Sequence, residues 1–76
     1  MKKYYWFSFS YQGENQGVCL VEAENSELAR QKVVELGIAP QCDHIKCFGI
    51  AEAEIPLNTL FTADEMIKSG YTPKAF

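Results

Sequence analysis

The only histidine of the chain and two of its three cysteines fall within six residues, in the stretch CDHIKC at positions 42–47. Thiolate sulfurs and imidazole nitrogens are the ligands of structural zinc sites, which usually take four of them from closely spaced pairs. Cys42 and Cys47 have a C-x4-C spacing, and His44 lies between them. Cys19 is the remaining cysteine and would complete a set of four. A zinc ion that staples a small domain is therefore the first chemistry to weigh.

The polarity pattern around this cluster argues against a shared metal site. Residues 43–54 alternate along the chain in a way that predicts a β-strand. Alternate residues of a strand face opposite sides of the sheet, so His44 and Cys47 point apart. Cys19 lies inside the apolar stretch VCLVEA, where cysteine acts as a small hydrophobic residue. We therefore predict no metal and no cofactor; in the opposite case the ligands are Cys19, Cys42, His44 and Cys47.

A cysteine–histidine catalytic pair is the second chemistry that this stretch suggests. A thiolate nucleophile needs a neighbouring base and an electropositive, partly exposed surrounding that lowers the thiol pKa. Cys42 and His44 are close in sequence, but Asp43 between them carries the wrong charge to stabilise a thiolate. No glycine-rich oxyanion loop or phosphate-binding loop accompanies them. We predict that the protein is not an enzyme.

Length and composition narrow the class of protein. A chain of 76 residues, of which 47% are hydrophobic and 22% charged, predicts one folded domain over residues 1–76. The formal net charge is -3, and the seven Lys and Arg residues form no basic patch of the kind that nucleic-acid binders carry. No stretch approaches the ~20 apolar residues of a membrane span. We expect no nucleic-acid partner and no membrane partner.

The number of cysteines and the first residues of the chain indicate the cellular compartment of the protein. Three cysteines are an odd number, which excludes a complete set of intramolecular disulfides and favours a reducing compartment. Lys2 and Lys3 precede an apolar run, but that run stops at Ser10 without a small-residue cleavage site after it. We predict a cytoplasmic protein.

The elements that must position these residues begin with the aromatic stretch KKYYWFSFSY. Alternation along a strand sends its aromatic side chains to both faces of the sheet, four to one face and two to the other (Tyr5, Phe7, Phe9 and Tyr11; Tyr4 and Trp6). A strand that is apolar on both faces is usually central in its sheet. The polar stretch QGENQG at 12–17 predicts a loop, and VCLVEA at 18–23 predicts the second strand of a hairpin.

The clearest helix signal covers residues 26–36. Asn25 or Ser26 can cap its first turn, and Gly37 can take the left-handed conformation that ends it. Apolar residues at helical spacing predict a buried stripe made of Leu28, Ala29, Val33 and Leu36. Arg30 is among the residues expected to face water.

A shorter helix is predicted near the C-terminus. Thr62 and Glu65 have the spacing of a capping box, in which each side chain satisfies the backbone N–H of the other residue. Met66 and Ile67 are the expected core contacts, and Gly70 would close the helix.

The order strand, strand, helix, strand, short helix predicts an α+β fold. A hairpin followed by a right-handed crossover helix gives a three-stranded antiparallel sheet in the order 2-1-3, with the main helix packed on one face. Residues 4–52 form the core of this domain, and residues 53–76 form a C-terminal extension. The second face of the sheet is then covered by the extension, covered by another subunit, or left as a binding surface.

Aromatic residues on that second face are the candidate binding residues, namely Tyr4, Trp6 and Phe48. Exposed aromatic rings on a sheet can stack nucleotide bases, but the acidic net charge offers no attraction to phosphate. A hydrophobic central strand is the plainer interpretation of the same residues. Trp and Tyr are also frequent in protein-binding hot spots, which favours a protein partner or self-association over nucleic acid.

Short motifs are spread along residues 4–52. They are W-x-S-F in the first strand, Gly-Val-x-x-Val-Glu-Ala in the second, an alanine in the helix and Leu-Gly-Ile-x-Pro after it (residues 6–9, 17–23, 29 and 36–40). In these motifs the chain resembles a family of small hypothetical proteins of bacteria and their phages, which brings no known activity. Such proteins commonly have Gly-Gly-Glu after the proline, where this chain has Gln-Cys-Asp at 41–43. The resemblance therefore implies that Cys42 is incidental.

Small size, mild acidity and the aromatic strand favour a non-catalytic, protein-binding accessory or inhibitor protein of phage or mobile-element origin. It would act through the aromatic sheet face, and a homodimer is one form this could take. The first alternative is a small-ligand or nucleotide-binding module, which would show a pocket lined by aromatic residues and the 37–43 loop. The second alternative is the zinc-stapled structural domain described above.

Overall fold

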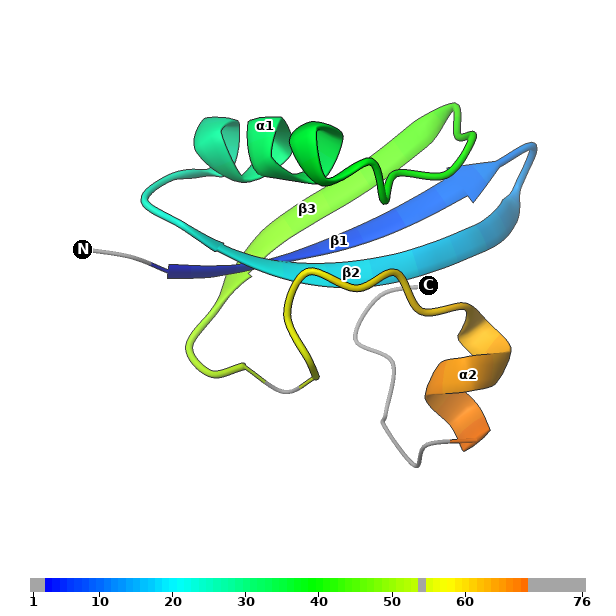
Figure 1. Ribbon diagram of the computed structural model, residues 1–76. Helices are drawn as coiled ribbons and strands as arrows, with labels where there is room; N and C mark the ends of the chain where they lie inside the picture. Colours follow the sequence, from blue (N-terminus) through cyan, green and yellow to red (C-terminus); the bar gives the residue numbers. More distant parts are fainter. Residues whose placement is uncertain (1–2, 54, 69–76) are drawn as a thin grey trace.

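The chain forms one three-stranded sheet with a helix on either side (Figure 1). A computed structural model describes residues 3–53 and 55–68. The elements in chain order are β1 (Lys3–Tyr11), β2 (Glu14–Ala23), α1 (Ser26–Leu36), β3 (His44–Ile50) and α2 (Ala63–Lys68). Both strand pairings are antiparallel and the strand order is β2-β1-β3, so the predicted α+β fold is confirmed.

The β1–β2 turn is tighter than the sequence suggested. Only Gln12 and Gly13 lie between the strands, with φ angles of 51° and 83°. Two successive positive φ angles are typical of a two-residue turn whose twist matches that of the flanking strands. The polar residues expected to form a longer loop instead extend β2 back to Glu14, and Asn15 donates a hydrogen bond of 3.0 Å from Nδ2 to Ser8 Oγ.

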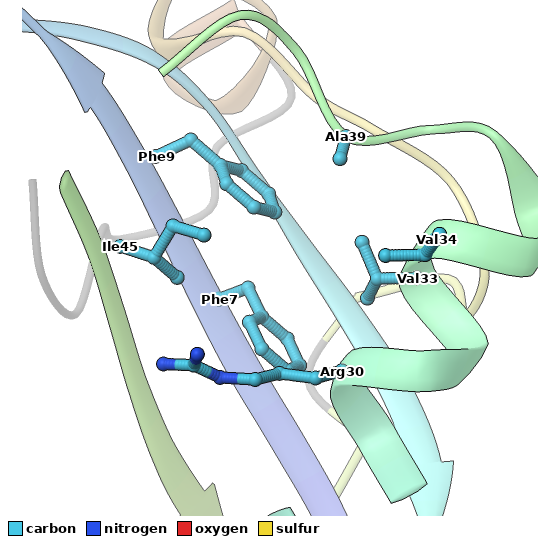
Figure 2. A pocket seen from close by; sticks show the side chains of 7 residues that line it. All are labelled: Phe7, Phe9, Arg30, Val33, Val34, Ala39 and Ile45. Carbon is cyan, nitrogen blue, oxygen red and sulfur yellow. The ribbon is translucent and has the colours of Figure 1, made fainter. Parts of the chain in front are cut away.

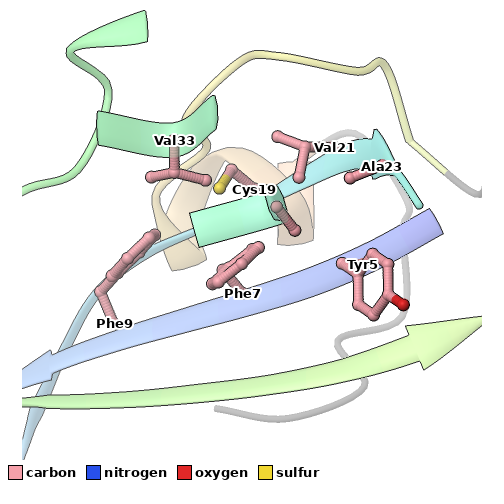
Figure 3. Close-up of a cluster of buried hydrophobic side chains, with 8 residues drawn as sticks. Tyr5, Phe7, Phe9, Cys19, Val21, Ala23 and Val33 are labelled. Atoms are coloured by element: carbon pink, nitrogen blue, oxygen red, sulfur yellow. The ribbon is translucent and has the colours of Figure 1, made fainter. Parts of the chain in front are cut away.

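The first face of the sheet packs against α1 as predicted (Figure 3). Its core joins alternate residues of β1 and β2 to the helix (Tyr5, Phe7, Phe9, Cys19, Val21, Ala23, Ala29 and Val33). The Asn25 side chain caps α1 by accepting a hydrogen bond of 2.9 Å from the Leu28 N–H, and Gly37 ends the helix in the left-handed region.

The buried stripe of α1 is narrower than predicted. Ala29 and Val33, four residues apart, are the buried residues of the helix. Leu28 and Leu36 were expected in the core, but each is 42% exposed. The helix contacts the sheet through a single row of residues spaced four apart. Apolar residues on either side of that row therefore remain exposed to solvent. Val34, whose exposure the sequence did not predict, is 72% exposed.

The second face is covered by the chain itself, which decides among the three alternatives left open by the sequence. Ile55 and Met66 are buried there against Trp6, Val18 and Leu20. Figure 1 shows α2 and the segment before it on the side of the sheet opposite α1. The C-terminal extension therefore contributes to the core.

Backbone hydrogen bonds attach this covering segment to the outer edge of β2. Val18 and Phe61 form a two-way bridge, with N···O distances of 2.7 and 2.8 Å, and the Asn58 N–H donates to Leu20 O at 2.8 Å. Gly17 makes the approach feasible, because a Cβ atom there would lie 2.9 Å from Leu60 Cδ1 and Gly17 has a φ of 140°. A side chain at position 17 would push the segment away from β2.

The capping box of α2 is confirmed. The Glu65 N–H donates to Thr62 Oγ1 at 3.2 Å, and the Thr62 N–H donates to Glu65 Oε1 at 3.1 Å. Of the two predicted core contacts, Met66 is fully buried, whereas Ile67 is 66% exposed because it lies on the next position around the helix. Gly70, expected to close the helix, lies outside the described residues.

Replacing Met66 with Ala should lower the free energy of unfolding by about 2–5 kcal/mol, because it removes a fully buried side chain and leaves a cavity under the sheet. Ile67→Ala is the matched control on the same helix, and its effect should stay within about 0.5 kcal/mol. Urea unfolding followed by tryptophan fluorescence measures both, since Trp6 lies in the affected cluster. Equal effects of the two substitutions would contradict the covering role of α2.

Candidate functional site

The residues of the CDHIKC cluster are not brought together around one point. His44 is exposed at the start of β3, Cys42 and Cys47 are half-buried, and Cys19 is fully buried. Cys19 and Cys47 both lie opposite Phe7, one on each side of β1, which sets their Cα atoms about 10 Å apart at two strand spacings. Within residues 3–53 and 55–68, no three His, Cys, Asp or Glu side chains form a group that could hold a metal ion.

Burial governs the chemistry of the two strand cysteines. Burial, together with a smaller effect of the neighbouring Cys47, raises the pKa of Cys19 to about 12. Burial also raises the pKa of Cys47, although the positive charge of Arg30 lowers it in part. Both thiols are therefore protonated at neutral pH, the form that is neither nucleophile nor metal ligand.

Alkylation of the native protein at pH 8 should leave Cys19 unmodified. With its pKa at about 12, roughly one molecule in 10⁴ carries the thiolate at this pH, and the side chain is out of reach of the reagent. Peptide mass mapping after iodoacetamide treatment, with and without urea, gives the result for each cysteine. Labelling of Cys19 without denaturant, at the rate seen in urea, would contradict its burial.

The aromatic residues predicted to bind a partner have different environments. Trp6 is 1% exposed, so the expectation that it contacts a partner on an open face is corrected. Phe48 stacks on it with ring centroids 6.4 Å apart, and Tyr4 and Phe48 remain half-buried. The Trp6 Nε1 atom is buried without a hydrogen-bond partner among the described residues. Ile55 and Met66 cover the indole, which the sequence could not indicate because they lie far from it in the chain.

A pocket opens between α1 and the sheet on the opposite face (Figure 2). Its volume is about 160 Å³. Phe7 and Phe9 of β1 form its floor, with ring centroids 6.1 Å apart, and Ile45 of β3 lies directly opposite Phe9. The remaining lining comes from α1 and the segment after it (Arg30, Val33, Val34 and Ala39). The narrow contact of α1 with the sheet leaves this space open on the β3 side.

Arg30 is the one charged residue among the described residues that line the pocket. Figure 2 shows its side chain extending from α1 beside Phe7 toward β3. No hydrogen bond or ion pair joins its guanidinium to another residue of the described chain. Arg30 is exposed and its guanidinium is hydrated, and a negatively charged group bound beside the apolar cavity can pair with it.

Two further hollows meet the pocket at Arg30. One is lined by residues of α1, and the other by the start of β3 and the residues before it (Arg30, Gln31, Val34 and Glu35; Arg30, Cys42, Asp43, His44 and Ile45). Asp43 is held in place, because its Oδ2 accepts a hydrogen bond of 3.1 Å from the Gln12 N–H and its own N–H donates to Ser10 O at 2.9 Å. The three hollows therefore form one surface centred on Arg30.

The sequence indicated some of this site. A ligand pocket was expected to be lined by aromatic residues and the 37–43 loop, and Phe7, Phe9 and Ala39 match that description. Arg30 was expected to face water and is exposed, but the sequence did not indicate that it also borders a pocket.

Comparisons with known proteins give no match to this chain among protein-family models, curated proteins or solved structures. The resemblance to small bacterial and phage proteins therefore stays a prediction. No helix in the described part of the chain is long and apolar enough to cross a membrane.

Proposed function

We propose that this protein is a non-catalytic binding module for a small ligand, held in the pocket between α1 and the sheet. The observation that carries the proposal is a cavity of about 160 Å³, floored by Phe7 and Phe9 and bordered by the unpaired guanidinium of Arg30. The protonated state of the strand cysteines supports a binding role over thiol catalysis.

The size of the cavity limits the apolar part of the ligand. An apolar protein cavity of about 150 Å³ is large enough to bind benzene, so this pocket accommodates one six-membered ring or a branched chain of similar volume. The edges of Phe7, Phe9 and Ile45 would contact such a group, while Val33 lies at the helix side.

The position of Arg30 sets the polar part of the ligand. Its guanidinium can donate two parallel hydrogen bonds to a carboxylate, which gives orientation as well as affinity. Ligands with a compact apolar body and a single carboxylate one or two bonds beyond it satisfy both halves of the site. A neutral ligand of the same shape would leave the guanidinium without a partner.

The protein-binding accessory or inhibitor function remains the second candidate. Trp6 was one of the three residues predicted to form the binding surface, but its side chain is buried and cannot contact a partner there. Tyr4 and Phe48 are half-buried and lie on β1 and β3, so a contact at this side of the sheet keeps two of the three predicted residues. Phage origin and cytoplasmic location stay part of this proposal.

Titration with phenylacetate should shift the backbone amide NMR signals of Phe7, Phe9 and Ile45, and phenylacetamide should bind more weakly. Arg30→Gln should weaken binding of the carboxylate about tenfold, because it removes a charge-assisted contact. Lys46→Gln is the matched control, since it removes one positive charge from an exposed β3 residue on the other face of the sheet.

The absence of shifts at the pocket with millimolar probe would contradict the proposal. Equal weakening by Arg30→Gln and Lys46→Gln would show that only net charge matters and would remove Arg30 from the site.

A further inference from the structure

The two edges of the sheet differ in how they are protected. The outer edge of β2 pairs with the covering segment through Val18 and Leu20. β3 is the other edge, and no described residue pairs with its outer side. An unpaired edge exposes a row of backbone donors and acceptors that can accept another strand.

β3 also lacks most of the features that usually keep an edge strand from pairing. It contains no proline, and its register with β1 is regular from Tyr4↔Ile50 to Ser10↔His44. Lys46 is the one edge-protecting feature in its sequence, since a lysine on an edge strand discourages pairing, and neither a bulge nor a proline accompanies it.

The surfaces beside this edge are thinly covered on both faces of the sheet. On the α1 face, Ile45 is half-buried at the pocket. On the other face, Phe48 and Ile50 are half-buried, because α2 and its preceding segment pack on the β2 side. A strand added to β3 would therefore bury apolar side chains above and below it as well as satisfying its backbone.

We propose that the strand added to β3 is the β3 of a second copy of this chain, paired antiparallel about a two-fold axis. The two sheets would join into one of six strands, and both α1 helices would lie on the same face. The two-fold axis passes perpendicular to the sheet, which is the arrangement that keeps equivalent faces on the same side. This inference is independent of the ligand proposed for the pocket.

The sequence of β3 is compatible with pairing to itself. Centring the two-fold on Cys47 places Lys46 beside Phe48 of the second copy, Ile45 beside Gly49, and His44 beside Ile50. No pair opposes two charges of the same sign, and an ammonium beside an aromatic ring is a favourable contact. A shift of one residue that centres the axis on Lys46 would oppose two lysines, which disfavours that register.

Gly49 offers a substitution that blocks the edge without disturbing the fold. A Cβ atom there would lie 3.8 Å from Tyr4 O and 3.9 Å from Tyr5 Cε1, which are ordinary contacts. Gly49→Lys adds a charge opposite Ile45 of the second copy. Gly49→Ala adds the Cβ without the charge, and Thr59→Lys adds the same charge at an exposed residue on the β2 side.

Sedimentation velocity and sedimentation equilibrium test the proposal. Wild type, Gly49→Ala and Thr59→Lys should sediment near twice the 8.6 kDa chain mass, and Gly49→Lys should raise the dimer dissociation constant at least about tenfold. A wild-type chain that stays at 8.6 kDa up to about 1 mM would overturn the proposal. So would a Gly49→Lys variant that dimerises as tightly as wild type.

Hydrogen exchange on the wild-type protein tests the β3 interface independently, so it still applies if Gly49→Lys does not fold. Exchange of the β3 amides should slow as protein concentration rises, while exchange of the β2 amides stays constant. A concentration dependence confined to other segments would place the interface elsewhere and overturn the assignment to β3.

Discussion

The two-sided burial of β1 is the constraint on which the structure depends. Phe7 and Phe9 point to one face and Trp6 to the other, and all three are 1% exposed. A strand with large apolar side chains on both faces needs a neighbour on each side and a cover on each face. β2 and β3 supply the neighbours, α1 covers one face, and the segment from Ile55 to α2 covers the other.

Within residues 3–53 and 55–68, neither cover extends over the whole sheet. α1 lies on the sheet through Ala29 and Val33, and α2 packs on β2, so both covers favour the β2 half. The pocket, the half-buried Phe48 and the outer edge of β3, with which no described residue pairs, are three consequences of this one asymmetry. It leaves Ile45, Phe48 and Ile50 of β3 only half-buried, and both proposed interactions are located there.

The CDHIKC stretch shows how register decides chemistry. Cys47 belongs to the face beneath α1, His44 is exposed at the end of the strand, and Cys42 precedes it in the connecting segment. Cys19 of β2 and Cys47 of β3 both pair with Phe7 of β1, so the central strand lies between the two cysteines. Burial then keeps both of these thiols protonated, and Cys19 and Cys47 serve in packing.

Local signals in the sequence determined the element order, the caps and the strand order. Asn25, Gly37 and the Thr62–Glu65 pair act over a few residues, and alternation in β1 depends only on its own side chains. Only the tertiary structure decided that Ile55 and Met66 cover Trp6, that Leu28 and Leu36 stay exposed, and that Arg30 borders a pocket. Helical periodicity shows which residues share one face of a helix. How deeply each of them is buried depends on where the helix lies relative to the sheet, and the sequence pattern does not fix that position.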